Sequence, residues 1–366
     1  MIRHKIFLFS LILVLPLFLG ACIGSSKSSS SLAVLGGVFK TVDFGKTWVS
    51  KSAVATVKNQ PVNINELDML SLVSDPQDPM TIYAGTSFGM FYSYDFGESW
   101  NQARGMKTGK INGVAVHPSE KCTLYATTGR YVYKSKDCGR SFESIHYNDS
   151  PTAEVDAIVV DSFNPEIIYI GTMDGDLIKT IDGGKTWKTM YRFKKPVHRL
   201  ILAKDTRILW AGVYGLGAVV SLDGGESWEE ESLKAQKAFS NYKDVLDLAY
   251  HADSNTLISS GKHGLLKTID NGQTWESLPI LTAPGELLLY SVAIHPRDEK
   301  QIYYGTDRSF NYSNDGGQNW ATFRLPAASR VYQILIYGGA PQADATTTVA
   351  GPSTHVLIGL KKPPKD

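Results

Sequence analysis

The sequence has little that would point to catalysis or to nucleic acid. Its 366 residues carry 37 Lys and Arg against 36 Asp and Glu, a net charge of +1, whereas strong nucleic-acid binders usually show a clear basic excess. Only three cysteines are present, and two Cys without close histidine ligands are a poor zinc site. There is no phosphate-binding glycine loop, nucleophile elbow or metal motif. We therefore expect no nucleic-acid partner, no cofactor and no metal.

Long apolar runs are also scarce, and the exception lies at the start. Arg3, His4 and Lys5 precede an apolar run of 15 residues, 6–20, which is short for a membrane-spanning helix and has the layout of a signal peptide. The run ends in Leu-Gly-Ala-Cys at residues 19–22, which resembles a bacterial lipobox. That resemblance implies lipidation of Cys22; the alternative is ordinary secretory cleavage with a spare cysteine.

These features predict an exported, membrane-anchored bacterial lipoprotein. Ile23 rather than Asp follows the cysteine, which resembles sorting to the outer membrane if the cell is Gram-negative. We divide the chain into a signal peptide (1–22), a Ser-rich flexible tether (23–32), one folded domain (33–361) and a tail (362–366).

An eight-residue pattern recurs seven times along the chain. The copies are TVDFGKTW (41–48), SYDFGESW (93–100), SKDCGRSF (135–142), TIDGGKTW (180–187), SLDGGESW (221–228), TIDNGQTW (268–275) and SNDGGQNW (313–320). Their aspartates are 52, 42, 45, 41, 47 and 45 residues apart. Periods of roughly 40–50 residues are typical of four-stranded propeller blades.

Each position of the pattern has a physical reason. The first hydroxyl and the Asp can bond backbone N–H groups of a tight turn, the glycine accepts a backbone angle that side chains resist, and the final Trp can pack on the neighbouring unit. A calcium loop needs several acidic ligands at alternate positions, whereas each copy has one carboxylate. We predict structural turns. Their aspartates and tryptophans are Asp43, Asp95, Asp137, Asp182, Asp223, Asp270, Asp315, Trp48, Trp100, Trp187, Trp228, Trp275 and Trp320.

The pattern resembles the Asp-box, or bacterial neuraminidase repeat, of sialidases, sortilin-type receptors, xyloglucan-cleaving glycosidases and photosystem II stability and assembly factors. Short apolar runs before each copy suit innermost strands, and strands ending in Gly-Thr follow them. Segment 33–50 supplies the second half of a unit, and segments 331–337 and 355–360 supply the first half. We predict an all-β fold: a single seven-bladed β-propeller of four-stranded antiparallel blades, its closing blade built from both termini.

The turns at the two ends of such blades differ in their candidate residues. Cys122 and Cys138 lie in turns at the same end, so a disulfide between them is expected in an oxidising compartment, with free thiols as the alternative. The opposite end is where a binding site is expected. It collects a candidate basic face for an acidic protein or glycan: Arg104, Lys107, Lys110, Arg130, Arg192, Lys194, Lys195, Lys262 and Arg308.

The resemblance leaves two functions open. Sialidases carry an arginine triad and an early Arg-Ile-Pro tripeptide that is absent here, and other glycosidases need two carboxylates across a cleft, for which Asp174 and Asp176 are poorly spaced. The best likeness is to the assembly factors, although the basic residues here are mostly scattered lysines. We therefore predict no catalytic residues and a protein-binding scaffold or assembly factor; the alternative is a cell-envelope protein that binds or cleaves glycans.

Overall fold

The computed structural model describes residues 33, 35–54, 62–203, 207–228, 237–338 and 354–364. The signal segment, the lipidation residue Cys22 and the tether, all predicted from the sequence, lie outside the described residues. So does most of the loop between the last two strands. None of the described residues forms a helix long and apolar enough to cross a membrane.

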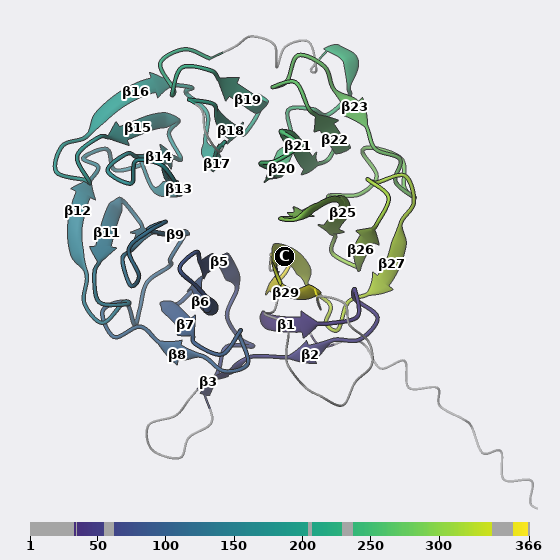
Figure 1. Cartoon of the computed structure of the whole chain (residues 1–366), viewed down its shortest axis with the longest axis horizontal. Coiled ribbons are helices and arrows are strands. Elements are labelled where there is room, and N and C mark those ends of the chain that lie inside the picture. Colours follow the sequence, from purple (N-terminus) through teal and green to yellow (C-terminus); the bar gives the residue numbers. More distant parts are fainter. Residues whose placement is uncertain are drawn as a thin grey trace, which may run out of the picture. The chain divides into compact units, whose positions relative to one another are not determined.

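Seven antiparallel sheets are arranged as the blades of a propeller around a central axis (Figure 1). Each blade begins with its innermost strand, and these strands are, in order, β5 (Met69–Asp75), β9 (Gly113–Val116), β13 (Val155–Val160), β17 (Val197–Leu202), β20 (Val245–His251), β24 (Ser291–His295) and β28 (Arg330–Gly338). The second strands are β6 (Asp78–Thr86), β10 (Leu124–Thr128), β14 (Ile168–Thr172), β18 (Leu209–Val213), β21 (Thr256–Gly261), β25 (Asp298–Gly305) and β29 (Thr354–Lys361). The predicted all-β propeller is confirmed.

The outer half of each blade follows the same order. The third strands are β7 (Met90–Ser93), β11 (Tyr131–Ser135), β15 (Asp176–Thr180), β19 (Gly217–Ser221), β22 (Gly264–Thr268), β26 (Ser309–Ser313) and β1 (Gly37–Thr41). The outermost strands are β8 (Asn101–Gln102), β12 (Glu143–Tyr147), β16 (Lys188–Arg192), β23 (Glu276–Ser277), β27 (Ala321–Arg324) and β2 (Val49–Ser50). In the fourth blade the described residues give three strands, β17, β18 and β19.

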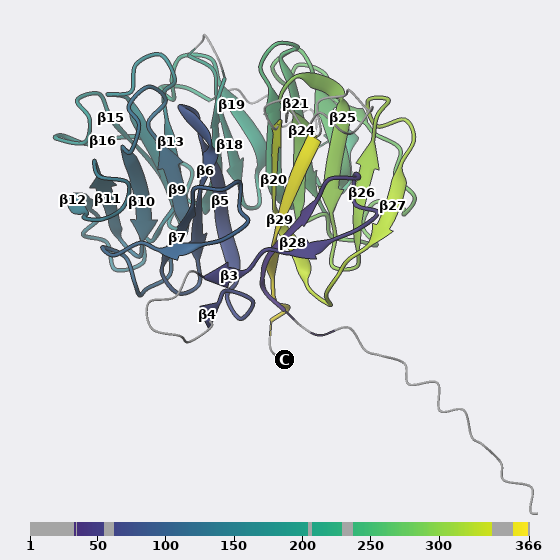
Figure 2. The same ribbon diagram turned by 60° about the horizontal axis from the view of Figure 1, so that its bottom comes forward.

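The ring closes through a blade shared by the two ends of the chain, as predicted. Its strand order is β2-β1-β29-β28, so β1 pairs with β29 along the register from Gly37 opposite Leu360 to Thr41 opposite Val356. A short hairpin of β3 (Ala53–Val54) and β4 (Val62–Asn63) follows β2. In Figure 2 this hairpin and the C-terminal end of β29 lie on the same side of the ring.

All seven repeated turns use one hydrogen-bond scheme. In the first copy, the Thr41 hydroxyl donates to Asp43 (2.7 Å) and accepts from the N–H of Gly45 (2.9 Å), while Asp43 accepts from the N–H and hydroxyl of Thr47 (2.9 and 2.6 Å). The glycine has φ 99°, in the left-handed region that β-carbons disfavour. The carboxylate of each turn therefore accepts its hydrogen bonds from residues of the same turn.

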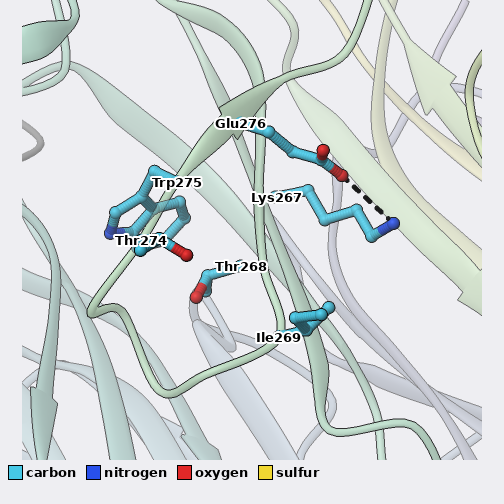
Figure 3. A pocket seen from close by; sticks show the side chains of 6 residues that line it. All are labelled: Lys267, Thr268, Ile269, Thr274, Trp275 and Glu276. Atoms are coloured by element: carbon cyan, nitrogen blue, oxygen red, sulfur yellow. Dashed lines mark ion pairs between the residues drawn. The ribbon is translucent and has the colours of Figure 1, made fainter.

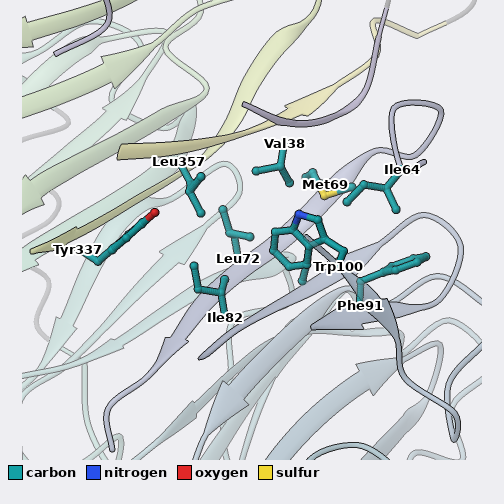
Figure 4. Close-up of a cluster of buried hydrophobic side chains, with 10 residues drawn as sticks. Val38, Ile64, Met69, Leu72, Ile82, Phe91, Trp100, Tyr337 and Leu357 are labelled. Atoms are coloured by element: carbon teal, nitrogen blue, oxygen red, sulfur yellow. The ribbon is translucent and has the colours of Figure 1, made fainter. Parts of the chain in front are cut away.

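The final aromatic residue of the repeat packs against the preceding blade. Trp100 is fully buried, and its indole N–H donates to the Lys51 carbonyl (2.6 Å) at the end of the closing blade. Figure 4 shows it among Val38, Met69 and Leu357, which come from the closing and first blades, with Ile64 contributed by the segment after β4. Trp187 and Trp320 bond carbonyls of their preceding blades in the same way. The tryptophans therefore connect successive blades.

The turn between the first and second strands lies at the same end as the repeated turn. In the second blade Cys122 and Cys138 join these two turns through a disulfide bond. In other blades the turn is held by a side chain at the end of the innermost strand: His251 Nδ1 lies 2.8 Å from the Ser254 hydroxyl, and His295 Nδ1 accepts from the N–H of Arg297 (3.2 Å). This end of the propeller is built mainly from side chains that stabilise turns.

Candidate binding site at the mouth of the central channel

At the opposite end of the propeller, one residue from each blade lines one of two adjoining cavities near the axis. Five innermost strands carry a β-bulge near their start, in which one residue, the third in β28 and the second in the other four, has no partner on the neighbouring strand. Such bulges redirect a side chain. In β9 and β24 the residue just before the strand holds the equivalent place. We call these seven residues the mouth ring: Leu70, Asn112, Asp156, His198, Leu246, Tyr290 and Tyr332.

The residue after each mouth-ring position often bonds the next blade. Gln333 donates to the Leu70 carbonyl (2.9 Å), Ser291 donates to the Val331 carbonyl (2.7 Å), and Ser71 accepts from the N–H of Val114 (3.1 Å). These bonds cross from blade to blade around the axis. The backbone that carries the mouth ring is therefore held at several points, which favours a preformed site.

One buried ion pair belongs to this set. The Arg199 guanidinium Nε donates to Asp247 at 2.7 Å, and Asp247 also accepts from the N–H groups of Leu248 (2.9 Å) and Val292 (3.1 Å). The Asp247 side chain is 10% exposed. It therefore neutralises Arg199 and ties the fifth blade to the fourth and sixth.

Five of the seven mouth-ring residues line a small polar cavity of about 40 Å³. Its lining includes the cations Lys110, Arg199 and Lys361 and the carboxylate of Asp156. Lys110 is exposed in the segment before β9. Lys361 is the last residue of β29 and lies opposite Arg330 in the register of β28 and β29. Three cations thus converge on one cavity from three blades.

A larger, mainly apolar cavity of about 340 Å³ adjoins the polar one and shares Asp156, His198 and Tyr332 with it. Its lining includes Met173 and Tyr214, which are 41% and 55% exposed although both are large apolar side chains. The remaining lining residues are Pro196, Val245, Leu246 and Tyr290.

Cations stack on two tyrosines of the mouth. The Lys361 ammonium lies 4.3 Å from the centre of the Tyr332 ring, and the Arg330 guanidinium lies 4.8 Å from that of Tyr290. Such cation–π contacts orient both partners. The mouth therefore offers fixed aromatic surfaces beside positive charge, a combination enriched in protein-binding hot spots.

Burial perturbs the ionisable groups of the mouth. It raises the pKa of Asp156, an effect that the nearby cations oppose, and it lowers the pKa of Lys361. Burial, together with the charge of Arg199, lowers the pKa of His198 to about 4, so this imidazole is neutral at pH 7.

The structure distributes the predicted basic face over a wide surface. Of its nine residues, Lys110 lines the small polar cavity of the mouth. Arg130 stacks over Tyr147, Arg192 pairs with Asp176 at 3.3 Å, and Arg308 lies 3.9 Å from Asp307. The others are exposed residues of the outer loops: Arg104, Lys107, Lys194, Lys195 and Lys262.

The residues that the mouth brings together were not predicted from the sequence, above all Asp156, Arg199, Tyr290, Tyr332 and Lys361. A signal was present for the mouth ring, because its members recur 42, 44, 42, 48, 44 and 42 residues apart, in step with the blades. Their chemical types differ, so no motif marks them.

Three carboxylates at this end of the propeller have bonded partners. Asp174 accepts from the Thr172 hydroxyl (2.6 Å), Asp176 pairs with Arg192, and Asp247 is held by Arg199. In the mouth this leaves Asp156 as the carboxylate without a bonded partner, and hydrolysis by a pair of acids needs two. Among the described residues, no group of three or more His, Cys, Asp or Glu is placed to hold a metal.

Other cavities lie beside the repeated turns. Figure 3 shows one of about 150 Å³ in the fifth blade, lined by Thr268, Thr274 and Trp275 of the turn and by the ion pair of Lys267 with Glu276 (3.2 Å). A cavity of about 310 Å³ occupies the same place in the third blade. Because residues of the same turn line both, we attribute them to blade construction rather than to a specific ligand.

Comparison with known proteins places the chain among propellers of this kind. Residues 89–209 match the family model described as sortilin, neurotensin receptor 3. An oligoxyloglucan-reducing end-specific xyloglucanase of Emericella nidulans is 25% identical over 187 residues, which cover 43% of this chain and 23% of that protein. The chain therefore spans about a quarter of that relative. The resemblance to Asp-box propellers is confirmed.

Solved structures agree on the fold. YCF48 from Cyanidioschyzon merolae superimposes with a TM-score of 0.58 at 14% identity, covering 80% of this chain and 95% of that one. A structure of YCF48 bound to D1 peptide gives 0.57 at 15%, covering 81% and 93%. The GH74 xyloglucanase from Xanthomonas campestris gives 0.58 at 17%, covering 70% and 45%. Identities this low show the fold alone.

Proposed function

We propose that this protein is a membrane-anchored, exported lipoprotein that acts as a non-catalytic scaffold, binding a segment of a partner protein at the mouth of its propeller. The observation that carries the proposal is the adjoining pair of cavities, one polar and cationic and one apolar, on a backbone held by bonds between blades. An extended protein segment can place an acidic side chain in the polar cavity and an apolar side chain in the cavity beside it. The lipobox-like residues 19–22 supply the anchor.

The similar fold of YCF48 supports a protein partner, since YCF48 has been solved with a D1 peptide bound. The match to this chain covers 95% of the YCF48 structure but only 45% of the xyloglucanase structure. The scaffold needs no chemistry of its own, which agrees with a mouth in which Asp247 is occupied by an ion pair.

A second candidate function is glycan binding. The tyrosines at the mouth offer flat aromatic surfaces on which sugar rings can stack, and Asp156 and Asn112 offer polar groups beside them. The xyloglucanase relative supports this candidate. Hydrolysis is less favoured, because a second carboxylate would have to be supplied.

Affinity purification from detergent-solubilised membranes tests the proposal. The mouth variant Met173→Ser/Tyr214→Ser changes two exposed side chains and should fold normally. A matched rim variant, Lys194→Ser/Lys195→Ser, removes two exposed lysines of the outer loops. We expect one membrane protein complex with wild type and the rim variant, and its loss with the mouth variant. If the complex is lost with the rim variant but not with the mouth variant, the binding site lies on the outer loops instead of the mouth. No reproducible partner with any of them, together with binding on a glycan array, would favour the second candidate.

A further inference from the structure

Asp156 differs from every other carboxylate described above. It is the bulge residue of β13 and lines both mouth cavities, yet within the described part of the chain its carboxylate has no hydrogen bond and no ion pair. Asp247, in contrast, accepts hydrogen bonds from Arg199, Leu248 and Val292. A half-buried carboxylate without a bonded partner contributes little to folding stability, so stability does not explain why an Asp occupies this position.

The surroundings of Asp156 are positive. Lys110, Arg199 and Lys361 line the same cavity and stabilise its charged form. Asp247 neutralises Arg199, whereas Lys110 and Lys361 have no carboxylate at ion-pair distance among the described residues. Asp156 therefore partly balances these two lysines in the free protein, together with Asp68, which acts on Lys361.

We propose that Asp156 competes with the ligand for the cations of the mouth: an anionic group attached to an apolar group binds beside Lys110 and Lys361, and Asp156 lowers its affinity. This inference rests on the proposed function, because it takes the mouth as the binding surface, and it names the chemistry of the segment that binds. The apolar group enters the cavity lined by Met173 and Tyr214, which adjoins the cationic one. Asp156 thereby disfavours simple anions more than it disfavours apolar segments. An anionic ligand that also fills the apolar cavity offsets the repulsion from Asp156.

The competition couples binding to protons. The charged and titratable groups that face Asp156 are Lys110 before β9, His198 and Arg199 of β17, Tyr332 of β28, Lys361 of β29 and, just before its own strand, Glu154. Asp247 of β20 is bonded to Arg199, and Asp68 acts on Lys361. A bound anion adds a negative charge to this set and raises the pKa of Asp156 further. Binding therefore takes up protons, and affinity increases as the pH falls toward the pKa of Asp156.

A small probe tests this without knowledge of the partner. We would titrate the full-length protein in detergent with 2-phenylethanesulfonate, which stays ionised throughout, and with the neutral 2-phenylethanesulfonamide, using NMR or calorimetry. Asp156→Asn should bind the sulfonate about tenfold more tightly at pH 7.5, as expected when one like charge is removed from a few ångströms away. The sulfonamide should bind both proteins equally.

Two variants control for site and for charge. Glu154→Gln removes an exposed acid two residues away and should change sulfonate affinity less than about twofold, since exposed charges are strongly screened. Lys361→Gln should weaken sulfonate binding severalfold. As the pH falls from 8 toward the raised pKa of Asp156, wild type should bind more tightly and Asp156→Asn should change much less, because His198 remains mostly neutral above its pKa of about 4.

Equal or weaker sulfonate binding by Asp156→Asn would overturn the inference, and so would indifference to Lys361→Gln. The result is separable from the proposed function. If the probe behaves as expected but no protein co-purifies, the anion site stands and the scaffold proposal fails. If a partner co-purifies through the mouth but Asp156→Asn binds the probe no better, the scaffold proposal stands and the role of Asp156 is wrong.

Discussion

The Arg199–Asp247 pair gives the most quantitative prediction for the ring. Asp247→Asn keeps the shape of the side chain but removes the charge that balances Arg199, and the amide group places a donor opposite either Val292 N–H or the Arg199 and Leu248 donors. Breaking a buried charge pair from one side typically costs 3–5 kcal/mol. Because the Arg199 side chain is 27% exposed and can regain some hydration, we expect about 3 kcal/mol, at the low end.

That loss translates into a measurable shift. A domain of roughly 330 residues has an unfolding entropy of about 0.7 kcal/mol/K near its midpoint, so 3 kcal/mol lowers Tm by about 4 °C. Urea unfolding followed by tryptophan fluorescence gives the free energy more directly. Glu98→Gln is the matched control: Glu98 also binds two cations, Lys40 and Lys51, but its side chain is 44% exposed, so we expect a loss below about 1 kcal/mol.

A double-mutant cycle separates the pair from its surroundings. Combining Arg199→Met with Asp247→Asn should cost less than the two single changes together, with a coupling energy of about 1–3 kcal/mol. A loss for Asp247→Asn no larger than that for Glu98→Gln, or strict additivity in the cycle, would refute the account of the pair as a buried link between blades.

Three further predictions concern the opposite end and the blade contacts. Replacing Cys122 and Cys138 by serine opens the disulfide between positions 16 apart and should cost about 3 kcal/mol, measured as the urea midpoint with and without reductant. Hydrogen bonds from Ser141 lower the pKa of Asp137 to about 2, below its unfolded value, so its stabilisation is complete above about pH 4 and is lost as the pH falls toward 2; the urea midpoint of wild type should drop over this window more than that of Asp137→Asn. Trp187→Phe removes the indole bond to the Ile145 carbonyl (2.9 Å) and should cost about 1 kcal/mol, whereas an unchanged midpoint would show that this bond is not a link between blades.

The blades and their closure could be predicted from the sequence because their signals are local and repeated. Each copy of the repeat determines its own turn: Asp43 and its equivalents bond residues two to four positions away, so no distant contact is needed. The partial units at the two ends could be added into one blade because the period was already known. The first interval of 52 residues was the sign of an insertion, which the structure shows as the β3–β4 hairpin.

The mouth could not be predicted in the same way. Whether Asp156 or Ala157 faces the axis depends on a bulge in β13, and a shift of one residue in register sends a side chain to the other face of the sheet. The sequence of a short apolar strand does not show that shift. Loop position alone likewise failed to distinguish Lys110, which reaches the cavity, from Lys194, which lies in the outer loops.

Site-specific photo-cross-linking in native membranes tests the central claim most directly. A photoreactive amino acid at Tyr214 samples the mouth, and one at Phe163, which is 62% exposed in the turn between β13 and β14, samples the opposite end. Our account predicts one discrete protein adduct from position 214, reduced by Lys110→Ser, and none from position 163. An adduct from position 163 alone, or none from either position in a protein that folds and reaches the membrane, would contradict it.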